Sequence, residues 1–300
     1  QIVAGHLTVG GLIACTILGG RALGALAQAT ALLARYQQAR TALQTLDGVM
    51  SLPPEREAGK TYLKPQPLRG EIEFAGVGFA YPGQAQPVLD KVSLRIGAGE
   101  KVGILGRIGS GKSTLLKLAG GLYAPAAGHI AIDGLDIAQF DPHDLRQGMG
   151  YLSQDAMLFL GTLRDNLKLG RPELEDDALL EALRIAEMGR FVARHPAGLD
   201  LPIGERGEGL SGGQRQAVAC ARMLLRDPRV VFMDEPSSAM DHATEVSFIA
   251  NLQAWLGTRT LLLVTHKPSM LALVDRIILI DGGRVVADGP KEVVLNALNK

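Results

Sequence analysis

The chain has 300 residues, which exceeds one typical domain and predicts a large domain with additional material. Its 31 basic and 31 acidic residues cancel, whereas a protein that mainly binds nucleic acid usually carries a basic excess. The two cysteines, Cys15 and Cys220, lie far apart in different contexts, so we expect reduced thiols with neither a disulfide nor a metal site. Composition therefore predicts no nucleic-acid partner and no disulfide-stabilised fold.

The first 34 residues are dominated by apolar side chains, and Arg21 is their only formal charge. The run 7–33 is long enough for a helix to cross a bilayer, which takes about 20 residues. Arg35, Arg40 and the charged remainder follow this run, so the positive-inside rule places its C-terminal end in the cytoplasm. We therefore predict a transmembrane helix.

Polar residues within this run leave a second interpretation open. Gln28, Thr30 and Arg21 dilute the hydrophobicity, as in an amphipathic or buried helix of a soluble protein. Gly20 and Gly24, in contrast, form a small-xxx-small pair that would admit a neighbouring membrane helix. A charge at the bilayer centre costs about 3 kcal/mol, so Arg21 either faces a cavity or partner, or snorkels at the bilayer boundary.

After the apolar run, residues 36–46 are polar and still compatible with a helix. Pro53 and Pro54 end any helix, and residues 53–67 have the composition of an extended linker. A helix that continues past the apolar run and then a linker are therefore expected before the main domain.

From Gly70 onward, strand patterns alternate with helix patterns. Helices are expected at 111–118, 175–194 and 216–225. Strands are expected at 71–74, 92–96, 102–105, 129–132, 230–233, 260–264 and 276–280. Such alternation predicts an α/β fold with a parallel sheet and crossover helices.

The third expected strand leads into a P-loop that fits G-x-x-x-x-G-K-[ST] without a mismatch. Its residues are Gly106, Arg107, Ile108, Gly109, Ser110, Gly111, Lys112 and Ser113. The glycines let successive backbone N–H groups point into one concavity that can hold phosphate oxygens. Lys112 supplies positive charge to the outer phosphates, and the Ser113 hydroxyl can reach Mg²⁺.

Two later strands end in residues suited to phosphoryl transfer. Asp234 and Glu235 follow an apolar strand, so Asp234 is expected to hold Mg²⁺ through water and Glu235 to be the general base. A solvated loop is the alternative for an Asp-Glu pair, but four preceding apolar strand residues favour the functional interpretation. His266 also follows a strand, and its imidazole is expected to contact the γ-phosphate and orient Glu235.

A serine- and glycine-rich segment precedes the helix expected at 216–225. Its residues are Leu210, Ser211, Gly212, Gly213 and Gln214. They offer a hydroxyl and exposed N–H groups at a helix start, which is an anion site strengthened by the helix dipole. A glycine-rich helix start without any ligand is the alternative for this pattern.

The P-loop, the L-S-G-G-Q segment and the Asp-Glu strand, in that order, resemble the ATP-binding cassette (ABC) family over residues 69–300. The resemblance implies that Tyr81 stacks on adenine and that Thr114 also contacts the nucleotide. It makes Gln154 a residue that touches Mg²⁺ or the attacking water. In the family, the L-S-G-G-Q signature binds the γ-phosphate of ATP held by a second cassette. A second identical subunit is therefore expected, in a two-fold ATP sandwich.

Three segments follow from this resemblance, because exporters of the family carry a six-helix membrane domain ahead of the cassette. Residues 1–50 are interpreted as the last transmembrane helix and its cytoplasmic extension, and 51–69 as a linker. Residues 70–300 are the expected nucleotide-binding domain. This domain combines a P-loop NTPase core with an antiparallel β subdomain and a helical signature subdomain at about 155–225. The start at Gln1, without an initiator methionine, is interpreted as that of a fragment of a longer chain.

Among exporters, the chain looks most like the type I secretion ATPases, on residues 106–114, 141–146 and 203–209. Glu205 lies in the last stretch and is a candidate for coupling to membrane loops of the opposite subunit. The resemblance implies the bacterial inner membrane, a multi-pass protein with a cytoplasmic cassette, a membrane-fusion adaptor and an outer-membrane channel. A lipid, drug or peptide exporter is the alternative, ahead of an importer ATPase or a soluble cassette ATPase of DNA repair or translation.

Overall fold

The computed structural model describes residues 8–52, 54–57, 59–63, 67–84 and 86–298, and it divides into two compact units between Gly59 and Lys60. In the first unit, helix α1 spans Val9–Met50 and is capped by Thr8, whose side chain accepts a hydrogen bond from the Gly11 N–H. Its 42 residues extend for about 63 Å, about twice the thickness of a bilayer's hydrocarbon core. By length and composition, α1 is able to cross a membrane. Residues 1–7 of the predicted segment lie outside the described residues.

Residues 60–69 of the predicted linker belong to the second unit, and several of them contact its later segments. Leu63 forms an isolated parallel bridge with Phe140. The Asp133 carboxylate accepts hydrogen bonds from the backbone N–H groups of Arg69, Gly70 and Glu71, at 2.7, 3.0 and 2.9 Å. One carboxylate therefore fixes the backbone immediately before the first strand. Residues 53, 58 and 64–66 of the predicted linker are outside the part of the chain that the structure describes.

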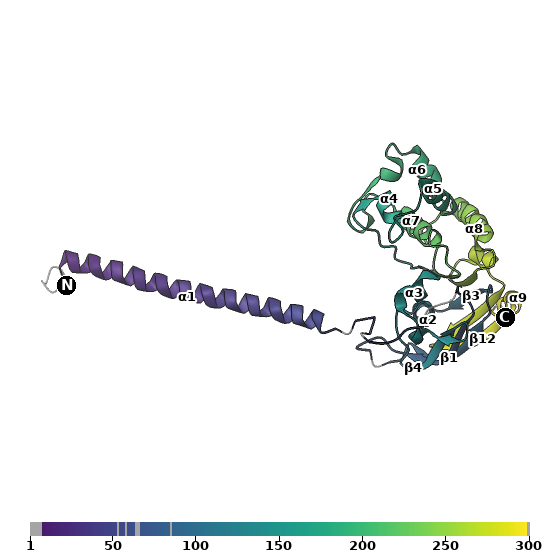
Figure 1. The fold of residues 1–300 in the computed structure, drawn as a ribbon, viewed down its shortest axis with the longest axis horizontal. Coiled ribbons are helices and arrows are strands. Elements are labelled where there is room, and N and C mark those ends of the chain that lie inside the picture. Colours follow the sequence, from purple (N-terminus) through teal and green to yellow (C-terminus); the bar gives the residue numbers. More distant parts are fainter. Residues whose placement is uncertain (1–7, 53, 58, 64–66, 85, 299–300) are drawn as a thin grey trace. The chain divides into compact units, whose positions relative to one another are not determined.

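Two main sheets form the second unit (Figure 1). The antiparallel sheet has the order β2-β1-β4-β5, with β1 at Ile72–Phe79, β2 at Leu89–Ile96, β4 at Ala127–Ile132 and β5 at Leu135–Asp136. The larger sheet has the order β12-β11-β3-β10-β9-β6 and is parallel except for β12, which runs antiparallel to β11. Its strands are β3 Lys101–Gly106, β6 Met149–Leu152, β9 Val230–Asp234, β10 Thr260–Val264, β11 Arg276–Asp281 and β12 Arg284–Pro290. The predicted α/β fold with an antiparallel β subdomain is confirmed.

The helices divide between the sheets and a separate helical subdomain. In Figure 1, α4, α5, α6 and α7 lie together, away from the antiparallel sheet. The α-helices of this unit are α2 Lys112–Ala119, α3 Pro142–Gln147, α4 Leu163–Leu167, α5 Asp176–Ile185, α6 Gly189–Arg194, α7 Gly212–Leu224, α8 His242–Leu256 and α9 Lys291–Leu298. A small two-stranded sheet pairs β7 Gly161–Thr162 with β8 Pro202–Ile203, and 3-10 turns occupy Ile137–Gln139, Gly198–Asp200, Glu205–Gly207 and Pro268–Leu273.

The central strands β9 and β10 of the large sheet are buried on both faces, which explains their continuous apolar sequences. Along β9, Val230 and Phe232 enter the core shared with the antiparallel sheet and α2, whereas Val231 and Met233 enter the core shared with the helical subdomain. The strand β10 alternates in the same way. Each central strand therefore joins two cores, and its C-terminal end is held rigidly where the functional residues begin.

Two helix predictions were wrong in detail. The stretch 175–194 is broken between α5 and α6, where Glu187 adopts a left-handed backbone with φ 61° that ends the first helix. The helix expected from residue 216 begins four residues earlier, because Ser211 caps α7 and places Gly212 and Gly213 in its first turn.

Candidate nucleotide site

The P-loop connects β3 to α2 through backbone shapes that favour glycine. Gly106 and Gly111 have φ values of 151° and 102°. A Cβ on Gly106 would lie 2.1 Å from the Ile280 carbonyl oxygen, and one on Gly111 would lie 2.6 Å from Leu89 Cδ2. Gly111 occupies the N-cap of α2, and no side chain caps this helix. The first N–H groups of α2 are thus left open to the loop's concavity.

A buried ammonium group and a buried hydroxyl lie within this loop. Lys112 Nζ donates hydrogen bonds to the Gly106 and Arg107 carbonyl oxygens, each at 2.8 Å. Burial lowers the pKa of Lys112 below its ordinary value, while the nearby Glu235 and Asp234 carboxylates act in the opposite direction. Ser110 Oγ is buried without a hydrogen-bond partner among the described residues. The loop therefore holds a buried ammonium group and a buried hydroxyl without a hydrogen-bond partner among the described residues.

The two predicted carboxylates lie at the C-terminal end of β9, in register with β10. Asp234 is 5% exposed and pairs with Val264. Glu235 has a left-handed φ of 51°, and its N–H donates to the Val264 carbonyl oxygen at 2.9 Å. Its Oε1 atom is buried and has no hydrogen-bond partner in the described part of the chain. The structure therefore holds an unsatisfied carboxylate oxygen near the P-loop lysine.

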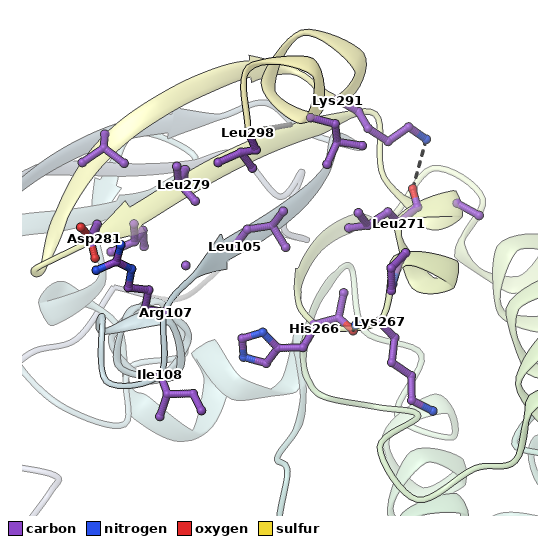
Figure 2. Close-up of a pocket in the computed structure, with 17 residues that line it drawn as sticks. Leu105, Arg107, Ile108, His266, Lys267, Leu271, Leu279, Asp281, Lys291 and Leu298 are labelled. Carbon is purple, nitrogen blue, oxygen red and sulfur yellow. Dashed lines mark hydrogen bonds between the residues drawn. The ribbon is translucent and has the colours of Figure 1, made fainter. Parts of the chain in front are cut away.

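His266 follows β10 and faces the same region. Its Nε2 atom lies 3.7 Å from Glu235 Oε1, slightly beyond a hydrogen bond. In Figure 2 the His266 ring points toward the P-loop, and His266, Arg107 and Ile108 line one cavity of about 1350 Å³. Strand order thus brings together the P-loop, Asp234, Glu235 and His266, as the sequence predicted.

Tyr81 lies beside the helix that follows the P-loop. Its hydroxyl shares a hydrogen bond of 3.0 Å with Thr114 Oγ1, and its ring meets the edge of Tyr123 at a centroid distance of 5.3 Å. Lys117 Nζ lies 5.8 Å from the ring centroid. These contacts bring two residues that were assigned to the nucleotide next to each other, and the stacking role of Tyr81 stays a prediction.

The signature segment forms a capping box at the start of α7. Ser211 Oγ accepts from the Gln214 N–H at 3.2 Å, and Gln214 Oε1 accepts from the Ser211 N–H at 2.8 Å. A Cβ on Gly213 would lie 2.8 Å from the Ala239 carbonyl oxygen, whereas one on Gly212 would lie 3.9 Å from its nearest neighbour. The pattern S-x-x-Q was the sequence signal for this cap, and it would have placed the helix start correctly.

Gln154 is exposed and lies two residues after the end of β6. It lines a pocket of about 240 Å³ with Gly212, Ser238 and Ala239, and none of the described residues that line this pocket belongs to the P-loop. The structure thus gathers Gln154 with the signature segment, and its contact with Mg²⁺ or water stays a prediction.

Sequence reasoning missed two buried contacts around this site. Gln216 on α7 donates from Nε2 to the Glu235 carbonyl oxygen at 2.6 Å. Glu245 on α8 accepts hydrogen bonds from Lys267, Ser269 and Ser237. Although burial disfavours its charged form, these hydrogen bonds hold the pKa of Glu245 below its usual value. Neither residue belongs to a motif, so only the folded structure identifies them.

This chain is similar to known proteins in sequence and in fold. The ABC transporter family model matches residues 89–238, half of the chain. The leukotoxin translocation ATP-binding proteins LktB of Mannheimia glucosida, Mannheimia haemolytica and Bibersteinia trehalosi are each 36% identical over 298 residues. These alignments cover 99% of this chain and 42% of each relative, so the chain spans less than half the relatives' length.

A solved structure agrees with the fold over most of the chain. A bacterial Atm1-family ABC exporter with ATP bound superposes with a TM-score of 0.79 and 32% sequence identity, over 87% of this chain and 46% of that one. The residues that the family model matches include the P-loop, the signature segment and the Asp234–Glu235 pair. The chain belongs to the ABC transporter family.

Proposed function

We propose that this chain is the ATP-hydrolysing part of a bacterial ABC exporter. One observation carries the proposal: the buried Glu235 oxygen without a hydrogen-bond partner among the described residues, next to the carboxylate of Asp234 and within electrostatic reach of Lys112. A buried carboxylate oxygen left unsatisfied costs free energy, and catalytic sites are where such groups are retained. The placement suits a general base that receives a proton from water attacking a γ-phosphate.

Binding of ATP rests on the P-loop and the residues around it. Backbone N–H groups from Gly109 to Lys112 hold the phosphates, and the Lys112 ammonium neutralises the outer ones. Tyr81 stacks on adenine, and Thr114 supports the nucleotide beside it. In this scheme the Lys112 ammonium group, which donates to two carbonyl oxygens in this structure, donates to phosphate oxygens instead when ATP is bound.

The donor set fits a magnesium ion bound with the nucleotide. Mg²⁺ keeps several waters and is usually held by one or two carboxylates together with substrate phosphates. The Ser113 hydroxyl and the Asp234 carboxylate supply such ligands, and Gln154 is a further oxygen donor from the adjacent loop. No group of three or more His, Cys, Asp or Glu suited to a metal occurs among the described residues. Bound there, Mg²⁺ neutralises charge on the β- and γ-phosphate oxygens.

His266 completes the catalytic group. At 3.7 Å from Glu235 Oε1, a small movement brings its imidazole within hydrogen-bond length of the carboxylate or of a γ-phosphate oxygen. It thereby orients Glu235 and the water between them. In this proposal Asp234 binds the metal, Glu235 accepts the proton, and His266 orients Glu235 and the water.

Two copies of the chain are required for this chemistry. The sequence has one P-loop and one signature segment, and residues 211–214 carry no group able to cleave a phosphate bond. We propose that Ser211, Gly212, Gly213 and Gln214 contact the γ-phosphate on the partner's P-loop, in an ATP-sandwich homodimer. ATP-driven closure of this dimer then drives transport.

The transported substrate is proposed to be a protein. Support comes from the relatives, whose names describe leukotoxin translocation, and from the length of their alignment with this chain. With α1 as the last transmembrane helix, the protein would be a multi-pass component of the bacterial inner membrane with its cassette in the cytoplasm. It would work with a membrane-fusion adaptor and an outer-membrane channel. A lipid, drug or peptide exporter is the alternative, because the cassette does not contact the cargo.

Substitution of Glu235 by glutamine tests the proposed catalysis. The variant keeps size and hydrogen bonding but removes the base, and loss of a general base commonly slows turnover by about 10²–10⁴-fold. ATP affinity should remain near that of the parent, because Lys112, Ser113 and Asp234 still hold MgATP. Phosphate release and ATP titration measure the two quantities. Full turnover in Glu235→Gln would contradict the proposal.

A further inference from the structure

Gln216 joins the signature helix to the catalytic carboxylate of the same subunit. It lies on α7, one turn after Gly212, and is 2% exposed. Its Nε2 donates to the Glu235 carbonyl oxygen at 2.6 Å, and its Oε1 accepts from Ser238 Oγ at 3.4 Å. A buried side-chain amide thus bridges α7 and the segment after β9.

The backbone of Glu235 needs such support. Its φ of 51° is left-handed, a conformation in which the Cβ of an L-residue crowds the following carbonyl oxygen. The Glu235 N–H is held by the Val264 carbonyl oxygen on β10, and its carbonyl accepts from the Ser238 N–H at 3.2 Å and from Gln216. The shortest of these hydrogen bonds is that from Gln216, and its donor lies on α7 in the helical subdomain.

We propose that Gln216 is a positioning residue that holds the left-handed turn at Glu235 and thereby aims its carboxylate. The inference rests on the proposed role of Glu235 as general base. It gives α7 two tasks in one cassette: its first turn faces the partner's nucleotide, and its second turn fixes the base that acts on the cassette's own nucleotide. A shift of α7 when the proposed dimer closes would therefore displace the Glu235 backbone.

The test is a Gln216→Met variant of the full chain in detergent, which keeps side-chain length but removes the donor and the acceptor. We expect kcat for ATP hydrolysis to fall about 10- to 100-fold, the range caused by small misplacement of a catalytic group. KM for ATP and the thermal midpoint should stay close to those of the parent. Gln253→Met, the same change at an exposed position on α8, is the matched control and should retain parental kcat.

A double variant separates positioning from a merely structural role. If Gln216 acts through Glu235, Gln216→Met should slow a Glu235→Gln protein little further, because the base is already absent. A proportional loss in both backgrounds, or a KM that rises as much as kcat falls, would overturn the inference. Should Gln216→Met not fold, Gln216→Glu keeps a polar side chain of the same length and replaces the Nε2 donor with an oxygen. It should show the same loss of kcat, and a parental kcat in either variant overturns the positioning role.

Different results would contradict the proposed function and the proposed role of Gln216. Full activity in Glu235→Gln removes the general base and the role of Gln216 together. A slow Glu235→Gln protein combined with a parental Gln216→Met protein leaves the proposed function intact and removes only the role of Gln216.

Discussion

The P-loop and the signature segment are both glycine-rich and both open a helix, yet the two helix starts differ. The N-cap of helix α2 is Gly111, which has a left-handed conformation and no side-chain cap, beside the buried Lys112. The N-cap of helix α7 is Ser211, whose hydroxyl and backbone N–H both form hydrogen bonds with Gln214. Within one subunit, the first helix start has no side-chain cap, whereas two N–H groups of the second, those of Ser211 and Gln214, are satisfied by side chains.

Gly111 of the P-loop and Gly212 of the signature segment differ in the space around them. The fold of the subunit itself requires Gly111, since a Cβ there would press on Leu89 and the backbone is left-handed. Gly212 has an exposed position and room for a Cβ. The described fold therefore leaves room for a side chain at position 212, and the proposed contact with a partner's γ-phosphate would give Gly212 a role outside the subunit. Comparison of the two loops therefore separates what the fold of one cassette requires from what the proposed dimer would require.

The largest effect is expected from Gly111→Ala, matched with Gly212→Ala. The first substitution places a Cβ 2.6 Å from Leu89 Cδ2 in a left-handed backbone, so the P-loop must deform and ATP binding should be lost. The second should leave the ATP affinity of the free subunit near that of the parent, because its Cβ would lie 3.9 Å from its nearest neighbour. Titration with a fluorescent ATP analogue measures both, and equal affinities in the two variants would remove the contrast between the loops.

A smaller effect is expected from Lys112→Ala. The change removes a charge-assisted hydrogen bond to the phosphates, worth about 1.5–3 kcal/mol, so ATP affinity should fall about ten- to a hundredfold. Calorimetric titration is the measurement. Unchanged affinity would show that Lys112 stays on the Gly106 and Arg107 carbonyl oxygens when ATP binds and would make the P-loop assignment wrong.

The smallest effect is expected from Ser211→Ala in the absence of nucleotide. Loss of an N-cap costs about 1 kcal/mol. The thermal midpoint of a unit of this size should therefore fall by about 2–4 °C. Ser113→Ala, a serine that caps no helix, is the control and should change the midpoint less. A Ser211→Ala protein as stable as the parent would mean that the capping box contributes nothing to the free subunit.

Patterns with a local cause could be predicted from the sequence. The strands β9 and β10 are continuous apolar runs because both faces of the sheet are covered, and the P-loop follows from its glycines. The start of α7 was misplaced, although its S-x-x-Q capping box was readable. The break between α5 and α6 depends on a left-handed Glu187, which no spacing rule signals.

Contacts between distant segments could not be predicted from the sequence. The hydrogen bond from Gln216 to the Glu235 carbonyl joins residues 19 positions apart in different elements, and that from Lys267 to Glu245 joins residues 22 apart. Hydrogen bonds of this kind depend on how α7 and α8 pack on the sheet. Local pattern therefore located the chemical groups, whereas the supports that orient them required the folded chain.

The central claim is that two copies of this chain close over ATP, each signature segment meeting the other's P-loop. Its most direct test is the oligomeric state of residues 60–300 carrying Glu235→Gln, measured by light scattering with and without MgATP. Because hydrolysis is blocked, the protein should be a dimer with ATP and a monomer without it. Addition of Ser211→Arg should abolish the dimer, since a bulky side chain would occupy the place of the γ-phosphate. An oligomeric state that does not depend on nucleotide in either variant would contradict the ATP sandwich.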